Sequence, residues 1–505
     1  MSHHGERGVA LALVVICIFV LSILAAAVYM LSQSNIASQE WNEERLQARY
    51  TAEGGCNLAV HMIIGGASVP GGDSTRLFIP QPPDSGWYEM PGEDMGLVMV
   101  VIDPDSDNAS VAEGNAYGVR ALGLEQAPDA DYTYGVETMV IPENFARFAT
   151  FLNQPPLGGF YGDGYRFDGP FFANGPICMW SGSASSDDDI WFYTFELASD
   201  YYYYSTGTAS NPQSSPIYAN LSVQPDERMV LGEPYWCLGV DPIPFGSGEV
   251  NWQDARDAAI AGGLYFPNGA LPSGTRIIIK NDTLIVKTSS VAAEQDFYIG
   301  GLTNPVVWID NNAGDQIFIK SMPPYVGGMT PTSPNGLSMG LTIGTNGSIV
   351  AFGPLQYYNR DIEDPNNDIM LGLLSVYGDF IIASDPDCSG SPDPWPDPWK
   401  SVTNSDVEYD CVVMVLDGDF HAVQYWLPYP AADFMIMGGY IVDTEGYTTE
   451  YYGPGNFGGY LTSIFYDIRL LSMHPPFFPQ TGRWDTVYWE ERPDLNEENI
   501  FWNRY

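Results

Sequence analysis

The chain has 505 residues, of which 45% are hydrophobic and 14% aromatic, and its 63 acidic and 19 basic residues give a formal net charge of -44. A chain of this length is expected to fold as roughly two or three units, and its density of aromatic residues excludes disorder over most of its length. The excess of carboxylates repels phosphate backbones, which argues against nucleic acid as a partner. It suits a protein outside the cytoplasm, where the charge serves solubility or attracts divalent cations.

Residues Val9 to Leu31 form the first expected element, an uncharged apolar run with Ser22 as its polar break. At about 1.5 Å per residue, a helix of this length crosses a hydrocarbon core of about 30 Å. The run is longer than the apolar core of a cleaved signal peptide. Arg7 precedes it and three glutamates follow within residues 40–44, so the positive-inside rule places the first eight residues in the cytoplasm. We expect a single-pass inner-membrane anchor with an extracytoplasmic body, periplasmic or on the cell surface.

The helix is expected to continue well beyond the membrane. No proline occurs from residue 32 to 64, and apolar side chains recur near helical spacing at Ile36, Trp41, Leu46 and Tyr50. The glycine pair at residues 65–66 then predicts the end of the helix.

Two strings that flank this helix resemble the N-terminus of PilX-type minor pilins and related pseudopilins. They are Arg7-Gly8-Val9-Ala10-Leu11 and, after the apolar run, the Ala-Arg-Tyr-Thr-Ala-Glu-Gly-Gly string at residues 48–55. The resemblance implies that a prepilin peptidase cuts after Gly8, which leaves Val9 as the new N-terminus. It also implies other pilin or pseudopilin subunits as partners, in addition to the membrane.

One position departs from the pilin pattern. Most pilins carry Glu at the fifth mature position, where its carboxylate meets the N-terminal ammonium of a neighbour in the filament. That position is Leu13 here. Some minor tip subunits of the family that the chain resembles share this departure. A plain signal anchor is the alternative for the same residues.

The rest of the chain has the pattern of short strands. Residues 69–86 are rich in Pro, Gly and Asp and predict a linker, and strands are expected at Met95–Ile102 and Tyr132–Ile141. Tyr201–Tyr204 in a strand would point alternately to opposite faces, either packed or exposed to stack on sugars.

From about residue 270, apolar segments of four to eight residues recur between Gly, Asn, Asp and Pro, with no helix between them. The segments are Arg276–Lys280, Thr283–Lys287, Val306–Asp310, Gln316–Lys320, Leu341–Gly344, Ser348–Phe352, Gly372–Val376, Asp379–Ala383, Cys411–Leu416 and Met435–Val442. This pattern predicts a parallel β-helix, or solenoid, and a β-sandwich is the alternative.

The predicted fold class is therefore α+β and mainly β, in three parts. Residues 1–66 form the cytoplasmic tip, the transmembrane helix and its extension, residues 67–265 a loop-rich β domain, and residues 266–505 a solenoid-like domain with a C-terminal cap.

The body resembles an uncharacterised domain found behind PilX-like N-termini in bacterial envelope proteins. Its most specific part is the Tyr-Asp-x-Arg-Leu motif at residues 466–470 with the Pro-Pro-x-Phe-Pro motif at 475–479. The resemblance implies an architecture and a location but no chemistry. Asp467 and Arg469 have the same-face spacing of a strand and are expected to cap the last coil, with the proline run covering unpaired strand edges.

The six cysteines suggest disulfides, because the body is expected to face an oxidising compartment. Cys178–Cys237 and Cys388–Cys411 are the candidate bridges, although spacing does not determine connectivity. Cys17 lies in the apolar run, and Cys56 is left over.

We expect no cofactor and no metal site, and calcium is the one candidate to weigh against that expectation. Asp103, Asp105 and Asp107 alternate as in a calcium-binding loop. The sixth position of that loop is Asn108 rather than Gly, and the twelfth is Gly114 rather than Glu, so a solvated acidic turn is the other interpretation.

Catalysis has no positive support in the sequence. The lysines of the strand segments are scattered, the histidines lack a nearby nucleophile motif, and no glycine-rich phosphate loop occurs. We therefore predict a non-enzymatic, pilin-like envelope protein, a structural or adhesive component of a type IV pilus or related secretion filament that contacts a surface glycan or protein. The alternative is a membrane-anchored carbohydrate-active enzyme or glycan-binding protein on a β-solenoid.

Overall fold

The computed structural model describes residues 4–64, 77–79, 87–90, 96–104, 117–126, 131–155, 161, 166–180, 190–205, 217–220, 229–289, 292–321, 336–362, 364, 367–383, 407–422, 432–446, 448–453, 456–471 and 473–496. The chain divides into two compact units. Unit 1 comprises Met1–Asn108, Gly114–Ile141 and Trp484–Tyr505, and unit 2 comprises Pro142–Arg483 with residues 109–113. Unit 2 is thus an insertion between two stretches of unit 1.

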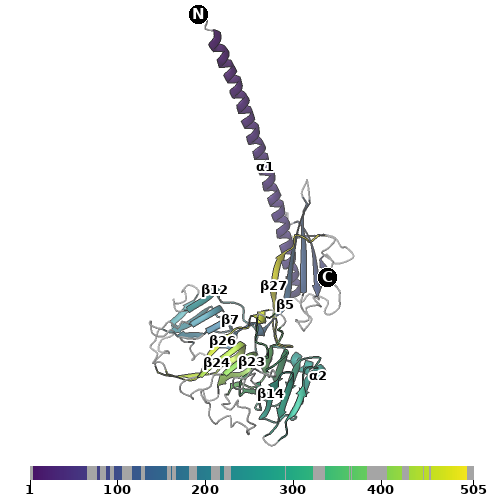
Figure 1. Cartoon of the computed structure of the whole chain (residues 1–505), viewed down its shortest axis with the longest axis vertical. Coiled ribbons are helices and arrows are strands. Elements are labelled where there is room, and N and C mark those ends of the chain that lie inside the picture. The colour runs from purple at the N-terminus through teal and green to yellow at the C-terminus, as the bar shows by residue number, and fades with distance from the viewer. Residues whose placement is uncertain are drawn as a thin grey trace. The chain divides into compact units, whose positions relative to one another are not determined.

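Unit 1 consists of one long helix, α1 (His4–Ile64), and an antiparallel sheet of order β1–β3–β4–β5–β27, with β2 paired to β3 (Figure 1). The strands are β1 (Leu77–Ile79), β2 (Tyr88–Glu89), β3 (Leu97–Pro104), β4 (Tyr117–Gln126), β5 (Asp131–Asn144) and β27 (Gln480–Glu491). The helix ends at Ile64, as the glycines that follow predict. The strands expected at residues 95–102 and 132–141 correspond to β3 and β5.

The second half of α1 packs on this sheet. Ala52, Cys56, Ala59 and Ile63 recur at helical spacing and are buried against apolar side chains of β3, β4 and β5. Gly123 of β4 permits the closest approach, because a Cβ there would lie 2.1 Å from the backbone oxygen of Ala48. The helix and the sheet therefore share one hydrophobic core.

Unit 2 is built mainly on two ladders of parallel strands between which the chain alternates. The first ladder runs β13 (Leu264–Phe266), β17 (Val306–Ile309), β19 (Leu341–Thr345), β21 (Leu371–Ser375), β23 (Val407–Ala422) and β24 (Ala432–Glu445). The second runs β14 (Thr275–Lys280), β18 (Gln316–Ser321), β20 (Ser348–Ala351), β22 (Phe380–Ile382) and the end of β23. Strands β15 (Thr283–Lys287) and β16 (Gln295–Tyr298) extend β14 in antiparallel fashion.

The first ladder continues past β24 into strands from the beginning of the unit. These are β6 (Thr150–Gln154), β7 (Arg166–Ala173), β9 (Ile190–Leu197) and β12 (Met229–Leu238), all parallel. The chain thus enters the ladder in the middle at β6, proceeds to one end at β12, crosses to the other end at β13 and returns to the middle at β24. The expected boundary at residue 265 is not followed, because strands on both sides of it pair in this ladder.

Four further strands complete unit 2. β26 (Asn456–Phe465) pairs with both β24 and β7, and β25 (Thr449–Gly453) forms a hairpin with it. β8 (Cys178–Trp180), β10 (Tyr201–Ser205) and β11 (Ile217–Asn220) form a separate small sheet. In β10, Tyr202 is buried, whereas Tyr201 and Tyr203 are half-buried, so the predicted alternation of the tyrosines is confirmed where side chains are described.

The interior of unit 2 is a continuous apolar cluster to which strands of both ladders contribute alternate residues. Aromatic rings stack from strand to strand in this cluster. The ring centroids of Phe380 and Phe420 lie 5.4 Å apart, and those of Phe420 and Tyr440 lie 4.9 Å apart. The next residues along each strand consequently point outward.

The outer face of the first ladder is covered by the crossing segment, residues 239–252, and the short helix α2 (Gln253–Gly262) that follows it. Phe245 lies 4.9 Å from Phe151 of β6, and Trp252 stacks on Trp308 of β17 at 5.5 Å between ring centroids. The connection between the two ends of the ladder is therefore itself part of the hydrophobic core.

The C-terminal motif covers another part of the same face. The hydroxyl of Thr342 in β19 donates to the carbonyl of Pro476, and a Cβ at Gly372 of β21 would lie 2.7 Å from the ring of Phe478. The proline run thus lies over a sheet face and not over strand edges. Asp467 and Arg469 do pair, but Arg469 lies in a 3-10 helix, η3 (Ile468–Leu471), and not in a strand, because the carboxylate of Asp467 also accepts from the backbone N–H of Arg469 and turns the chain.

Candidate functional site

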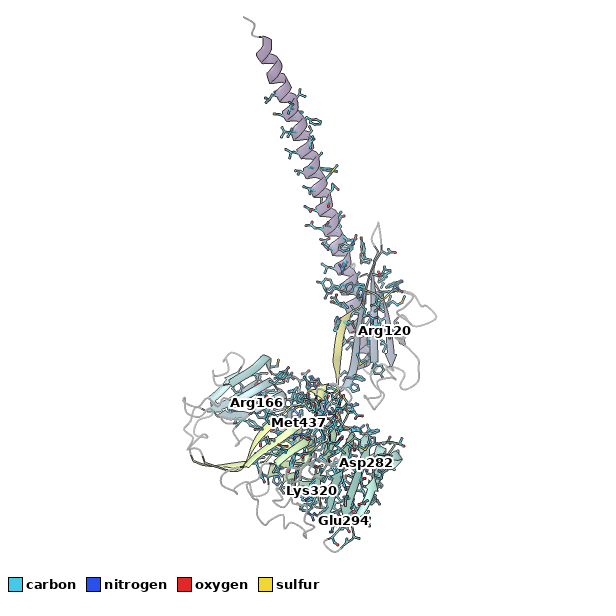
Figure 2. The ribbon with its side chains drawn as sticks, in the orientation of Figure 1. Arg120, Arg166, Asp282, Glu294, Lys320 and Met437 are labelled. Atoms are coloured by element: carbon cyan, nitrogen blue, oxygen red, sulfur yellow. The ribbon has the colours of Figure 1, made fainter. Side chains whose placement is uncertain are left out.

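The first half of α1 is the most distinctive surface of unit 1. Every described side chain from Leu13 to Leu31 is exposed, and Figure 2 shows this part of the helix extending beyond the sheet of unit 1. Exposure of the large apolar side chains ranges from 48% at Val20 to 71% at Met30. Since apolar area in water costs about 25 cal/mol per Å², so long an apolar surface requires lipid or other helices around it.

The polar group in this segment is satisfied internally. The hydroxyl of Ser22 donates to the carbonyl of Ile18 one turn earlier, at 2.8 Å. A helix with its backbone and hydroxyl bonds made within itself is compatible with a hydrocarbon environment. Of the described residues, α1 alone is long and apolar enough to cross a membrane, and it fits a membrane anchor.

Aromatic and basic side chains follow the apolar segment. Trp41 lies about 15 Å beyond Leu31 along the helix axis. Its ring meets the edge of Tyr132 in β5 at 6.5 Å between centroids, and the Arg45 guanidinium lies 5.6 Å from the Trp41 ring centre. Such amphipathic groups are typical of the region next to a membrane surface.

A charged contact joins the helix to the last strand of the sheet. Arg49 lies 2.8 Å from Glu53 one turn later and 3.2 Å from Glu491 in β27. The hydrogen bond that Arg49 donates to Glu53 and the charge of Glu491 raise the pKa of Arg49. These exposed pairs orient the helix on the sheet and add little stability.

The processing residues lie at the beginning of α1. Gly8 and Val9 are helical, but the structure describes no side chain before Leu13. Leu13 itself is 59% exposed and offers no charge to a neighbouring helix. Cleavage after Gly8 stays a prediction.

The candidate disulfide between Cys178 and Cys237 is not formed in this structure. Both thiols are free, because β8, which carries Cys178, pairs with β10, whereas β12, which carries Cys237, pairs with β9 in another sheet. Cys411 is also free and points into the apolar interior, where burial raises its pKa well above the usual value. Its expected partner Cys388 lies outside the described residues.

The candidate calcium loop is described only at its first residue. Asp103 lies in β3 opposite Gly118 of β4, and Asp105 and Asp107 lie outside the described residues. The structure brings together a group of possible metal ligands that the sequence did not predict. Asp379, Asp419 and His421 in unit 2 have ligand atoms within 4.8 Å of one another. Positions 419 and 421 are two residues apart, which indicates a shared face in a strand, but the sequence does not show that β22, which Asp379 immediately precedes, is the neighbouring strand.

Several buried carboxyl groups of unit 2 have structural partners. Hydrogen bonds from Arg256 lower the pKa of Asp310 to about 2, and Trp308 donates to the same carboxylate at 3.0 Å. Burial raises the pKa of Asp410 to about 6 although Arg360 lies 2.8 Å away. These ion pairs join segments of unit 2 that lie about 50 residues apart in the sequence.

Glu445 is a further carboxyl at the junction of the first and last parts of the ladder. It accepts hydrogen bonds from the hydroxyls of Tyr161 and Tyr440, the second at 3.0 Å. Burial raises its pKa to about 7 against the effect of these two donors.

Comparison with known proteins gives little to add to this geometry. No family model and no curated protein matches the chain. Among solved structures, the chain is similar to the competence-associated pilin ComZ from Thermus thermophilus, with a TM-score of 0.26 and 12% sequence identity over 89% of this chain and 98% of that chain. A TM-score this low carries no argument about the fold.

Proposed function

We propose that the chain is a pilin-like subunit of the cell envelope that holds a large β body outside the cytoplasm. One observation carries the proposal: α1 is a single helix of 61 residues with an exposed apolar first half and a second half packed on an antiparallel sheet. A plain signal anchor does not require that the helix continue unbroken into the folded domain. A subunit that leaves the membrane and enters the helical core of a filament requires such a continuous helix.

The proposed partners of α1 are the membrane and, after assembly, the corresponding helices of other pilin or pseudopilin subunits in a type IV pilus or related secretion filament. Both environments bury an apolar helix surface without requiring charge. The resemblance around Gly8 and Val9 supports processing before assembly.

Unit 2 is the proposed displayed part, and we assign it the architecture of a parallel β-helix. The alternation of the chain between two parallel ladders and the stacked rings in the interior support this assignment. Its proposed role is structural or adhesive and not enzymatic, with a surface glycan or protein as the contact.

The decisive experiment is N-terminal sequencing of the mature protein from cells with and without a prepilin peptidase. The proposal expects Val9 as the first residue only when the peptidase is present. Gly8→Ala should block processing, whereas Gly5→Ala, a matched glycine outside the motif, should leave it intact. An N-terminus at Met1 or Ser2 in every strain would leave only a plain membrane anchor.

Assembly is tested separately in sheared surface fractions. A filament subunit should appear there in the wild type and disappear when Gly8→Ala blocks processing. A protein that is cleaved but stays entirely in the membrane fraction would contradict the filament role and retain the processing.

A further inference from the structure

Asp379, Asp419 and His421 lie together on the outer face of unit 2. Asp379 immediately precedes β22, and the other two belong to β23, which pairs with β22 in parallel so that Phe380 is opposite Phe420. Both phenylalanines point into the interior and stack on each other. Because side chains alternate along a strand, the residues before and after them point outward together.

Local contacts hold this arrangement in place. The backbone N–H of Asp419 donates to the Asp379 carboxylate at 2.9 Å, which fixes that carboxylate beside the neighbouring strand. On the other side of His421, a Cβ at Gly446 would lie 2.7 Å from the His421 Cβ. A larger residue at position 446 would therefore displace His421.

The charges of the group are not balanced within the chain. Like charges on adjacent strands repel each other. Among the described residues, no lysine or arginine forms an ion pair with Asp379 or Asp419. Burial and the charges of Asp379 and Asp443 raise the pKa of Asp419, and His421 is the one group that acts in the opposite direction.

The donor atoms are those of a transition-metal site rather than of a calcium site. Two carboxylates and one imidazole combine oxygen and nitrogen, whereas calcium sites in proteins use oxygen alone. Because the three ligand atoms lie within 4.8 Å of one another, an ion central to them would lie at most about 2.8 Å from each, whereas Zn²⁺ prefers about 2.1 Å. Side-chain rotations that move each ligand atom by less than about 1 Å close that difference without moving either strand.

We propose that Asp379, Asp419 and His421 bind a divalent transition-metal ion of the Zn²⁺ or Mn²⁺ class. Asp419 is exposed and the other two are half-buried, so water or a ligand from a partner fills the remaining coordination positions. The ion neutralises the two carboxylates and links the beginning of β22 to β23. This inference concerns unit 2 alone and is independent of the pilin-like role of α1.

The test is metal binding by the full chain in detergent, with thiols blocked so that free cysteines do not compete. Excess Mg²⁺ occupies the many other carboxylates. We expect one Zn²⁺ or Mn²⁺ ion to bind per chain with micromolar affinity. Calorimetry measures the binding of either ion, and the loss of the EPR signal of free Mn²⁺ measures the binding of Mn²⁺. Because a metal-binding imidazole must be neutral, the affinity should fall on acidification.

Matched variants decide between a site and diffuse attraction. His421→Gln and Asp419→Asn should each weaken binding at least tenfold, whereas Asp257→Asn, an exposed acid on α2, should bind as the wild type does. Asp419 is exposed, so its variant retains the fold even if His421→Gln does not. Equal binding by all four proteins, or no saturable binding in the presence of excess Mg²⁺, would overturn the proposal.

Discussion

Gly123 offers the most direct perturbation of the contact between α1 and its sheet. It lies in β4, and the backbone of the helix passes directly over it. A methyl group in Gly123→Ala would lie 2.1 Å from the Ala48 carbonyl oxygen and 2.6 Å from the Ala52 nitrogen. These are backbone atoms of a helix, which cannot rotate away as a side chain can.

The cost follows from the displacement that relieves this clash. Normal contact requires the helix to move outward by more than about 1 Å, and a gap of that size forfeits a quarter to a half of each van der Waals contact across it. Ala52, Cys56 and Ala59 are fully buried in the same interface and lose these contacts together. With overpacking typically costing 1–3 kcal/mol, we expect docking of α1 to weaken by about 3 kcal/mol.

Cys56 is a native thiol that reports the docking of α1 without an introduced cysteine. It is fully buried, and burial together with the charge of Glu53 raises its pKa to about 12, so it reacts only when the helix lifts. Labelling of the intact protein in detergent with a maleimide, followed by peptide mass spectrometry, gives the rate at Cys56. At 1.4 kcal/mol per factor of ten, Gly123→Ala should accelerate it about 100-fold.

Gly54→Ala is the matched control, because its added methyl would meet only the end of the flexible Met90 side chain at 3.0 Å. Alanine also suits a helix better than glycine by about 1 kcal/mol, so labelling should be unchanged or slower. Equal rates for Gly123→Ala and the wild type would refute the close packing of α1 on β4.

Three other predictions concern unit 2 and are measured by urea unfolding of the full chain in detergent. The pKa of Glu445 is raised to about 7 in the folded protein. Its contribution to the free energy of unfolding is therefore fully present below the unfolded pKa of about 4.5 and is lost as the pH rises through 7. Stability should therefore fall by about 3 kcal/mol more between pH 5 and pH 8 in the wild type than in Glu445→Gln, and parallel pH profiles would contradict a buried carboxyl. Arg469→Met should cost about 3–5 kcal/mol by leaving Asp467 buried and unpaired, and a further Asp467→Leu should restore most of it; a double variant no better than the single would show that the pair is not the cause. Trp252→Ala should cost about 3 kcal/mol through the lost stacking on Trp308, whereas a cost below about 1 kcal/mol would mean that the crossing segment is not part of the core.

Local patterns predicted several elements of this protein, but the expected linker at residues 69–86 contains β1, and α2 was not predicted. The extent of α1 follows from a proline-free stretch that ends in glycines. The segment Thr283–Lys287 coincides with β15, and Val306–Asp310 exceeds β17 by a single residue. In each case the signal lies within a few consecutive residues, where backbone propensity and side-chain alternation act.

Pairing over long distances could not be predicted in the same way. Nothing near residue 150 indicates that β6 pairs with β24, nearly the whole length of unit 2 later in the chain. The absent Cys178–Cys237 bridge and the group at Asp379 depend on the same long-range order of strands. The 3-10 helix at Ile468 was mistaken for a strand because Asp and Arg two residues apart share a face in a strand but can also pair across a tight turn.

The order of the first ladder has a consequence for how the chain acquires its structure during synthesis. Strands β6, β7, β9 and β12 emerge first, yet β24, the neighbour of β6, is among the last to be made. Until then the early strands present an unpaired edge, which invites association with other chains. Contacts so distant in sequence also form slowly, so folding of this protein should depend on factors that keep the early strands from associating with other chains until β24 has been made.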